Sequence, residues 1–439
     1  MDKIADTAAI ANLPVVELEE ALAAFLAPVA AELPDERLRR VLVQAVQGIV
    51  GSQSPVVTEV ARGVEREQEH AWPLAKRIYR FLANGRFGHR QLLRGLVRIA
   101  RQAVAAANPA YLVVALDPVN FEKPYTKKLE AVSTVMKSTP PGPDGEKRLT
   151  PGYPAVTAAV VNLPSPVVCY AHWFSYRAKD FRSENRELWQ AIRATRLVFP
   201  RRRLRFVGDS GLDDQKLFGQ VRQAQAEFVV RASHLNRLVE VYNARLDRWE
   251  TESLADLVAT VPLGLRLEVA FHHARRERRV MVEIGWLQIR LPGQEWPLWV
   301  LTAHDPDLDR DLVLLTNVPI RSAADAQTVY TDWRHRPQIE HTYRFDQEDG
   351  LDVEDMRVRK LERMRRLFLL VLLAAMFVYH LGLAWPEPAV RWLRCLGGKL
   401  GLRIDRDGPY LLLAGIRAVF VTAATLAFAA HYPFPRGGT

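Results

Sequence analysis

Two apolar stretches of the sequence each end in an aspartate, and a third acid follows in a helical segment. YLVVALD ends at Asp117 and LRFVGD ends at Asp209, so both carboxylates are predicted at strand ends. Strands of one sheet can bring these residues together, and Glu340 lies in the helix predicted after a β-rich region. Three such carboxylates can bind two divalent cations, and Mg²⁺ or Mn²⁺ suits their oxygen atoms. The alternative is that each aspartate begins a turn.

The chemistry predicted for such a centre is that of phosphodiesters. Two divalent cations can activate a water or a 3′-hydroxyl on one side of the phosphorus and stabilise the leaving oxygen on the other. Basic residues accompany both acids, namely Lys123, Lys127 and Lys128 after the first and Arg201 to Arg203 before the second. An anionic substrate is therefore favoured at this place.

The helix that carries Glu340 is predicted to begin at Ser322, where Asp325 completes a capping box. It is expected to continue to about residue 347. Counted from Glu340 in steps of four and seven, one face collects stacking and phosphate-binding side chains: Trp333, Arg336, Arg344 and Gln347. An ordinary salt-bridged helix face is the alternative interpretation.

The elements that must position these residues divide the chain into five parts. Residues 1–105 read as helices, and the basic residues Lys76, Arg77, Arg80 and Arg86 suggest a helical DNA-binding region, with a helical cap that has a solvated basic face as the alternative. Residues 106–236 alternate strands and helices, which predicts an α/β fold with a mixed sheet flanked by helices. A β-rich inserted subdomain is expected at 237–320, the second part of the core at 321–384 and a helical region at 385–439.

Composition limits the class of protein and its partners. The 439 residues carry a formal charge of +10, which favours nucleic acid or an anionic membrane surface as a partner. Two cysteines cannot form a disulfide framework, and the acidic N-terminal residues do not resemble a signal peptide, so a cytoplasmic protein is expected. Residues 367–385 and 410–430 are apolar enough for membrane helices, but His380 and Arg417 favour buried core helices instead.

Four motifs in this order carry a resemblance to a known family: ALDPVNF, VGDSGLDD, LLTN and RHRPQIEHTYRF. Together they resemble the DDE transposases of bacterial insertion sequences, in particular the family with a Tyr-Arg-Glu-Lys signature, over roughly residues 40–375. The resemblance implies an RNase H-like core whose third acid follows a β insertion. It also implies that Asp117, Asp209 and Glu340 are the catalytic residues and the ligands of two metal ions, and that Arg336 is the signature arginine.

Two positions depart from the signature. Trp333 stands where the family has tyrosine, and Gln347 stands where it has lysine. Tyr330 and Arg344 lie about one helical turn from these positions and are expected to substitute for them in DNA binding. The resemblance implies metal-dependent cleavage at insertion-sequence ends and strand transfer into target DNA by a homodimer in the bacterial cytoplasm. A catalytically inactive DNA-binding relative that acts as a repressor is the alternative, and a membrane protein is a weaker one.

Overall fold

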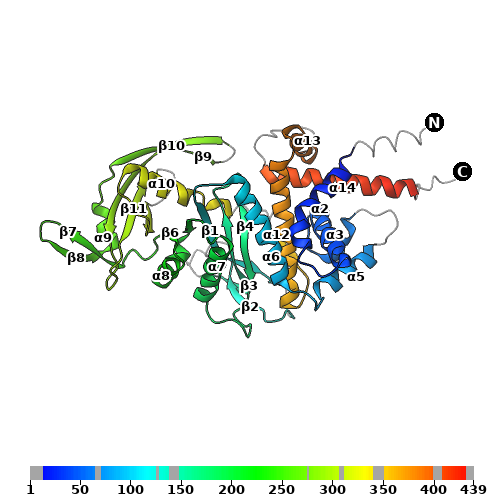
Figure 1. Cartoon of the computed structure of the whole chain (residues 1–439), viewed down its shortest axis with the longest axis horizontal. Helices are drawn as coiled ribbons and strands as arrows, with labels where there is room; N and C mark the ends of the chain where they lie inside the picture. The colour runs from blue at the N-terminus through cyan, green and yellow to red at the C-terminus, as the bar shows by residue number, and fades with distance from the viewer. Residues whose placement is uncertain are drawn as a thin grey trace.

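The computed structural model describes residues 13–64, 71–124, 128–137, 148–273, 276–305, 311–339, 351–398 and 408–431. These residues form an elongated molecule with three parts in a row (Figure 1). Helices lie at one end, the main sheet occupies the middle, and a small two-stranded hairpin forms the opposite end. The candidate chemistry lies in the middle part, where Asp117 and Asp209 are found.

The centre of the sheet has the strand order expected of an RNase H-like core. In spatial order its strands are β4 (Val167–Trp173), β3 (Leu149–Val160), β1 (Leu112–Glu122), β5 (Leu204–Gly208) and β6 (Glu227–Arg231). Strand β3 pairs antiparallel with both β4 and β1, whereas β5 pairs parallel with both β1 and β6. The predicted α/β class with a mixed sheet is therefore confirmed. A short strand, β2 (Ser133–Met136), pairs with the other end of β3.

The sheet is buried on both faces where the two aspartates are carried. Residues 112–116 of β1 are all at most 2% exposed, and successive side chains of a strand point to opposite faces. Their apolar character is thus explained, because helices must cover both sides of a parallel strand. Helix α7 (Glu184–Val198) packs on β3 and β4, and helix α6 (His89–Ala107) packs on β4.

The strands expected in the insertion are present, but most of them continue the central sheet. The region contains β7 (Leu238–Asn243), β8 (Arg248–Ser253), α9 (Leu254–Thr260), β9 (Leu265–His273), β10 (Arg276–Ile289), β11 (Leu298–His304) and β12 (Leu312–Thr316). Strand β12 pairs antiparallel with β6, and β11, β10 and β9 follow in order. This pairing satisfies backbone groups that an edge strand would leave open. Only β7 and β8 form a separate sheet among the described residues.

The helical end is built from both termini of the described chain. It contains α2 (Val15–Ala30), α3 (Glu36–Ser52), α4 (Val57–Arg62), α5 (Ala71–Leu82), α12 (Leu361–Ala384), α13 (Glu387–Gly397) and α14 (Gly408–His431). Helix α12 runs between the other helices and the sheet (Figure 1), and Phe368 contacts the rings of Phe121 and Trp173 at 5.4 and 5.2 Å. Gly95 lets α6 approach α2, since a Cβ atom there would lie 2.4 Å from the Cα of Val29.

Two of these helices are long and apolar enough to cross a membrane by length and composition. The most apolar part of α12 is 72% buried within the protein, which identifies α12 as a core helix. The corresponding part of α14 is 39% buried. The prediction of a buried core helix thus describes α12 better than α14.

The helix before Glu340 is shorter than predicted. Helix α10 (Ala323–Arg334) begins as expected, because the Ser322 hydroxyl accepts from the Asp325 amide at 3.2 Å. It ends at Arg334, and residues 335–336 form a turn before helical residues resume at Pro337. Proline has no amide hydrogen and disfavours the helical conformation of the preceding residue, so the continuous helix to residue 347 was a wrong prediction.

Candidate active site

Asp117 and Asp209 lie at the same level on two neighbouring strands. The parallel pairing of β1 with β5 joins Leu112 to Leu204 and Ala115 to Val207, which is a constant offset of 92 positions. Extended two residues beyond the last pair, the same offset relates Asp117 to Asp209, since 117 + 92 = 209. Asp117 itself is still within β1, whereas Asp209 is the first residue after β5. The fold therefore brings the first two predicted acids to one place at the end of β5.

Asp209 is accessible and has a cation beside it. Its side chain is 41% exposed, and its Oδ2 atom lies 3.6 Å from Nη1 of Arg336. The backbone turns immediately into the short helix η1 (Ser210–Leu212). Gly208 permits this turn, because a Cβ atom there would lie 2.2 Å from Cδ1 of Leu212. The carboxylate is thus held at a rigid strand end and still open to a ligand.

The other two acids of VGDSGLDD have structural roles. The Asp213 side chain is fully buried, accepts from the Ser233 and His234 amides at 2.8 and 3.0 Å, and pairs with Arg237 at 2.7 Å. Asp214 caps helix α8 (Gln215–Gln223) by accepting from the first amides of that helix. Turn chemistry therefore explains Asp213 and Asp214 but not the exposed carboxylate of Asp209.

A buried polar network anchors helix α10 to β5 and to Tyr111, the residue before β1. Arg205 of β5 is 2% exposed and forms an ion pair with Asp332 of α10, whose carboxylate also accepts from the Tyr111 hydroxyl at 3.0 Å. Glu227 completes the network by pairing with Arg205 at 2.9 Å. Burial raises the pKa of Asp332, while Arg205 and Tyr111 stabilise its charged form. The residue next to it, Trp333, donates its indole hydrogen to the Gly208 carbonyl at 3.1 Å.

This network was not predicted from the sequence, although a signal for it exists. Arg205 stands in the middle of LRFVG, an otherwise apolar buried strand. A buried arginine requires an acidic partner, and α10 offers Asp332 at the face that meets the sheet. The network fixes the level of α10 relative to the strands and so carries Arg336 to Asp209.

Two residues predicted to contact DNA are buried in this structure. Tyr330 is 1% exposed, its hydroxyl lies 3.5 Å from the Asp305 carboxylate, and burial raises its pKa to about 12. Lys123 is 4% exposed and donates to the carbonyl of Glu354, and burial lowers its pKa to about 8. A phosphate could reach Lys123 only if its contact with helix η2 (Val353–Asp355) opened. Their contacts with DNA remain predictions.

Several predicted site residues lie outside the described part of the chain: Lys127, Glu340, Arg344 and Gln347. Within the described ranges, no group of three His, Cys, Asp or Glu residues could hold a metal ion. Asp117 and Asp209 nevertheless fit a hard divalent cation, because both provide carboxylate oxygens from neighbouring strands. The guanidinium beside Asp209 indicates independently that this place stabilises positive charge.

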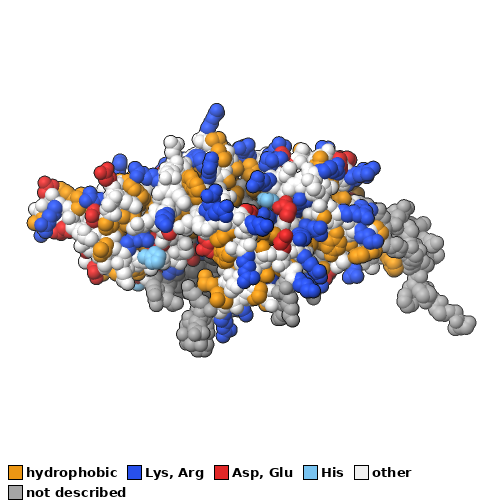
Figure 2. All heavy atoms as spheres, turned by 90° about the horizontal axis from the view of Figure 1, so that it is seen from below, with side chains coloured by type: hydrophobic (Ala, Val, Ile, Leu, Met, Phe, Trp, Pro, Cys, Tyr) orange, Lys and Arg blue, Asp and Glu red, His pale blue; other side chains and the backbone are white. Residues whose placement is uncertain are grey.

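Basic side chains are frequent on one face of the molecule. Figure 2 shows Lys and Arg side chains over the central and helical parts of one face, with acidic side chains between them. Part of the basic surface predicted to bind DNA is paired within the protein, since Arg86 contacts Asp35 at 2.5 Å. Arg94 and Arg98 both contact Glu32, at 2.8 and 2.5 Å. DNA binding by the N-terminal helices remains a prediction.

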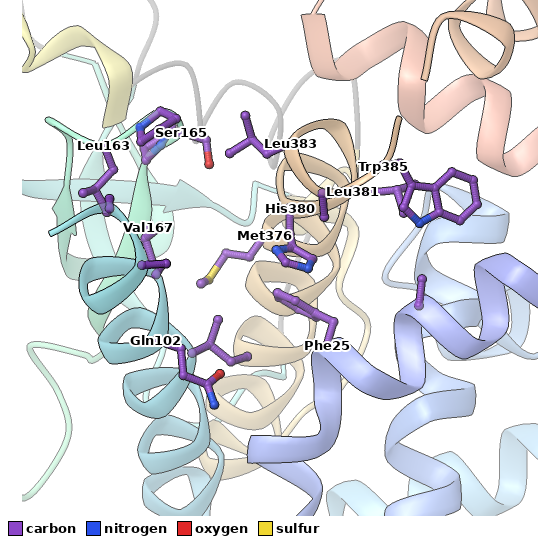
Figure 3. A pocket seen from close by; sticks show the side chains of 18 of the residues that line it. Phe25, Gln102, Leu163, Ser165, Val167, Met376, His380, Leu381, Leu383 and Trp385 are labelled. Carbon is purple, nitrogen blue, oxygen red and sulfur yellow. The ribbon is translucent and has the colours of Figure 1, made fainter. Parts of the chain in front are cut away.

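A separate apolar cavity of about 680 Å³ lies among α2, α6, the turn after β3 and the end of α12. Figure 3 shows Met376 and His380 of α12 pointing into it, with Phe25 of α2 below the imidazole. Burial lowers the pKa of His380. Neither aspartate of the strand ends lines this cavity, so it is distinct from the candidate active site.

Comparison with known families agrees with this geometry. The family model described as transposase DDE domain matches residues 110–377, which is 268 of the 439 residues. The match begins at the residue before Tyr111 and ends within α12, so it includes both aspartates, the insertion and α10. No curated protein matches the chain.

Proposed function

Because the chain belongs to the DDE transposase family, we propose that it cleaves DNA at the ends of an insertion sequence and transfers the freed strands into target DNA. Membership of the family supports a transposase-type nuclease. The observation that carries the proposal is the register of β1 and β5, which relates Asp117 to Asp209, with the Arg336 cation beside Asp209. Both acids follow buried stretches of strand, since residues 112–116 of β1 and 204–208 of β5 are buried, and this supports the fixed position that such a reaction requires.

In this proposal Asp117, Asp209 and Glu340 hold two Mg²⁺ or Mn²⁺ ions. When bound, the ions supply activation of the attacking oxygen and stabilisation of the leaving oxygen of the phosphodiester. The chain contributes the position of the carboxylates, which β1 and β5 fix at one level. It also contributes positive charge for the substrate, since Arg336 reaches the same place.

DNA is proposed to lie across the end of β5 and along α10. Arg336 would bind a phosphate there. Trp333 would keep its hydrogen bond to the Gly208 carbonyl and so hold α10 in place. The further DNA contacts proposed are Tyr330, Arg344, Gln347, Lys123 and Lys127. Both ends of a mobile element must be held at once, so a homodimer on double-stranded DNA in the cytoplasm is part of the proposal.

The test is a cleavage assay on DNA that bears the element's own ends. Asp117→Ala, Asp209→Ala and Glu340→Ala should each abolish Mg²⁺-dependent cleavage while retaining end binding in a gel-shift assay. Chelation of the metal should have the same effect on the unmodified protein. Asp247→Asn is a suitable control, because Asp247 lies in the distant β7–β8 turn with a φ of 48°, which asparagine also adopts. Full cleavage by any one of the three alanine variants would exclude the assigned role of that residue.

A catalytically inactive DNA-binding relative is the second candidate. It is favoured by Trp333, whose indole is engaged with the Gly208 carbonyl instead of presenting the hydroxyl of the signature tyrosine. Such a protein would bind the element ends with the same affinity in Mg²⁺ and in chelator. It would give no cleavage products with Mg²⁺ or Mn²⁺, and this result would decide for the repressor.

A further inference from the structure

Arg336 occupies an unusual position next to the candidate metal ligands. Its side chain is 11% exposed, and its Nη1 atom lies 3.6 Å from the Oδ2 atom of Asp209. The residue lies in the turn between α10 and Pro337, where its amide donates to the Trp333 carbonyl at 2.9 Å. The turn is held by α10, which the Asp332 network and the Trp333 indole fix to β5. The guanidinium is therefore held beside Asp209 by α10, which is itself fixed to β5.

A guanidinium and a divalent cation compete for the same carboxylate. Both are attracted by its negative charge, and they repel each other at the separations that simultaneous contact would impose. An arginine remains protonated in proteins, so it cannot avoid this repulsion by losing a proton. The side chain must instead move away from Asp209. A DNA phosphate offers a new partner, because guanidinium and phosphate form two parallel hydrogen bonds.

We propose that Arg336 competes with divalent cations for Asp209 in the DNA-free protein and releases this carboxylate when DNA phosphate binds the guanidinium. Metal loading is thereby coupled to the presence of the substrate. The coupling is reciprocal, so bound metal also increases the affinity for DNA. This inference rests on the proposed function, since it requires that Asp209 is a metal ligand.

The experiment measures Mn²⁺ affinity of the full chain, from the electron paramagnetic resonance of free Mn²⁺, with and without a non-cleaved DNA end. Without DNA, Arg336→Gln should bind Mn²⁺ about fivefold more tightly, the ratio that corresponds to about 1 kcal/mol for a partly exposed ion pair. DNA should tighten Mn²⁺ binding by the unmodified protein and have a smaller effect on Arg336→Gln. Arg336→Lys keeps the charge and should resemble the unmodified protein.

Arg334→Gln is the matched control, because Arg334 lies two residues earlier and contacts a different acid, Asp305, at 3.4 Å. It should leave the Mn²⁺ affinity unchanged. Thermal unfolding of every variant checks that it is folded. Equal or weaker Mn²⁺ binding by Arg336→Gln overturns the inference, and so does the absence of any effect of DNA on the unmodified protein.

Asp209→Asn separates failure of this inference from failure of the proposed function. If Asp209→Asn weakens Mn²⁺ binding and Arg336→Gln does not strengthen it, the metal site stands and only the competition is wrong. If Asp209→Asn leaves Mn²⁺ binding unchanged, Asp209 is no ligand, and both the inference and the proposed metal site are refuted.

Discussion

Replacing Asp332 by alanine should destabilise the protein by about 3 kcal/mol, which is near the lower end for removing one partner of a buried ion pair. The Asp332 side chain is 6% exposed and that of Arg205 is 2% exposed, so the variant leaves a guanidinium buried beside an empty space. The Tyr111 hydroxyl also loses its acceptor. The expected loss is at the lower end because Glu227 still pairs with Arg205 at 2.9 Å.

Urea unfolding measures this loss, followed by tryptophan fluorescence and far-ultraviolet circular dichroism. Asp332→Asn keeps an acceptor for Tyr111 but not the charge, and it should lie between the alanine variant and the unmodified protein. Glu187→Ala is the matched control. Glu187 lies on α7, its carboxylate is about as buried as that of Asp332, and it pairs with His172 of β4 at 2.9 Å. At temperatures where both are folded, only Asp332→Ala should reduce DNA cleavage. A loss below about 1 kcal/mol would show that the network does not hold α10.

Two predictions concern pH. Burial raises the pKa of Glu362, but hydrogen bonds from His89 outweigh this effect and lower the pKa from 4.5 to about 2. The ionised carboxylate therefore stabilises the fold above pH 4.5, and this stabilisation is lost as the pH falls toward 2. Glu362→Gln should unfold with a weaker acid dependence in this window, and an unchanged dependence would contradict the assignment. Burial lowers the pKa of Lys123 to about 8 from 10.5, so the unfolded chain binds more protons between these values and stability should rise with pH there. Urea titrations at both ends of this window should show that Lys123→Met removes the rise.

The sequence was informative about the strands and the first two acids for a physical reason. A buried strand is a continuous apolar run, so the polar residue that ends it is visible, as at Asp117 and Asp209. Their common level could not be read from the sequence, because it depends on the pairing register of β1 with β5. The third acid lies outside the described residues and stays a prediction.

Other features depended on interactions that local patterns do not encode. Strand β12 pairs with β6 across more than 80 positions, as Leu315 opposite Val230 shows, and no local periodicity specifies such a partner. The burial of Tyr330 and Lys123 results from contacts with Asp305 and Glu354 in distant segments. By contrast, the end of α10 was readable, since Pro337 interrupts the helical stripe.

Helix α12 determines how the predicted N-terminal region can act. Arg366 of α12 is 5% exposed and donates to the carbonyl of Asn84 at 2.7 Å, while Glu362 of the same helix accepts from the His89 amide at 2.8 Å. On its other side α12 presents Phe368 to Trp173 of β4. One helix thus completes the core of the helical end and covers the sheet that carries the aspartates. The N-terminal helices and the sheet therefore share one packed core, and a displacement of these helices would strain the sheet, because close-packed interiors transmit strain.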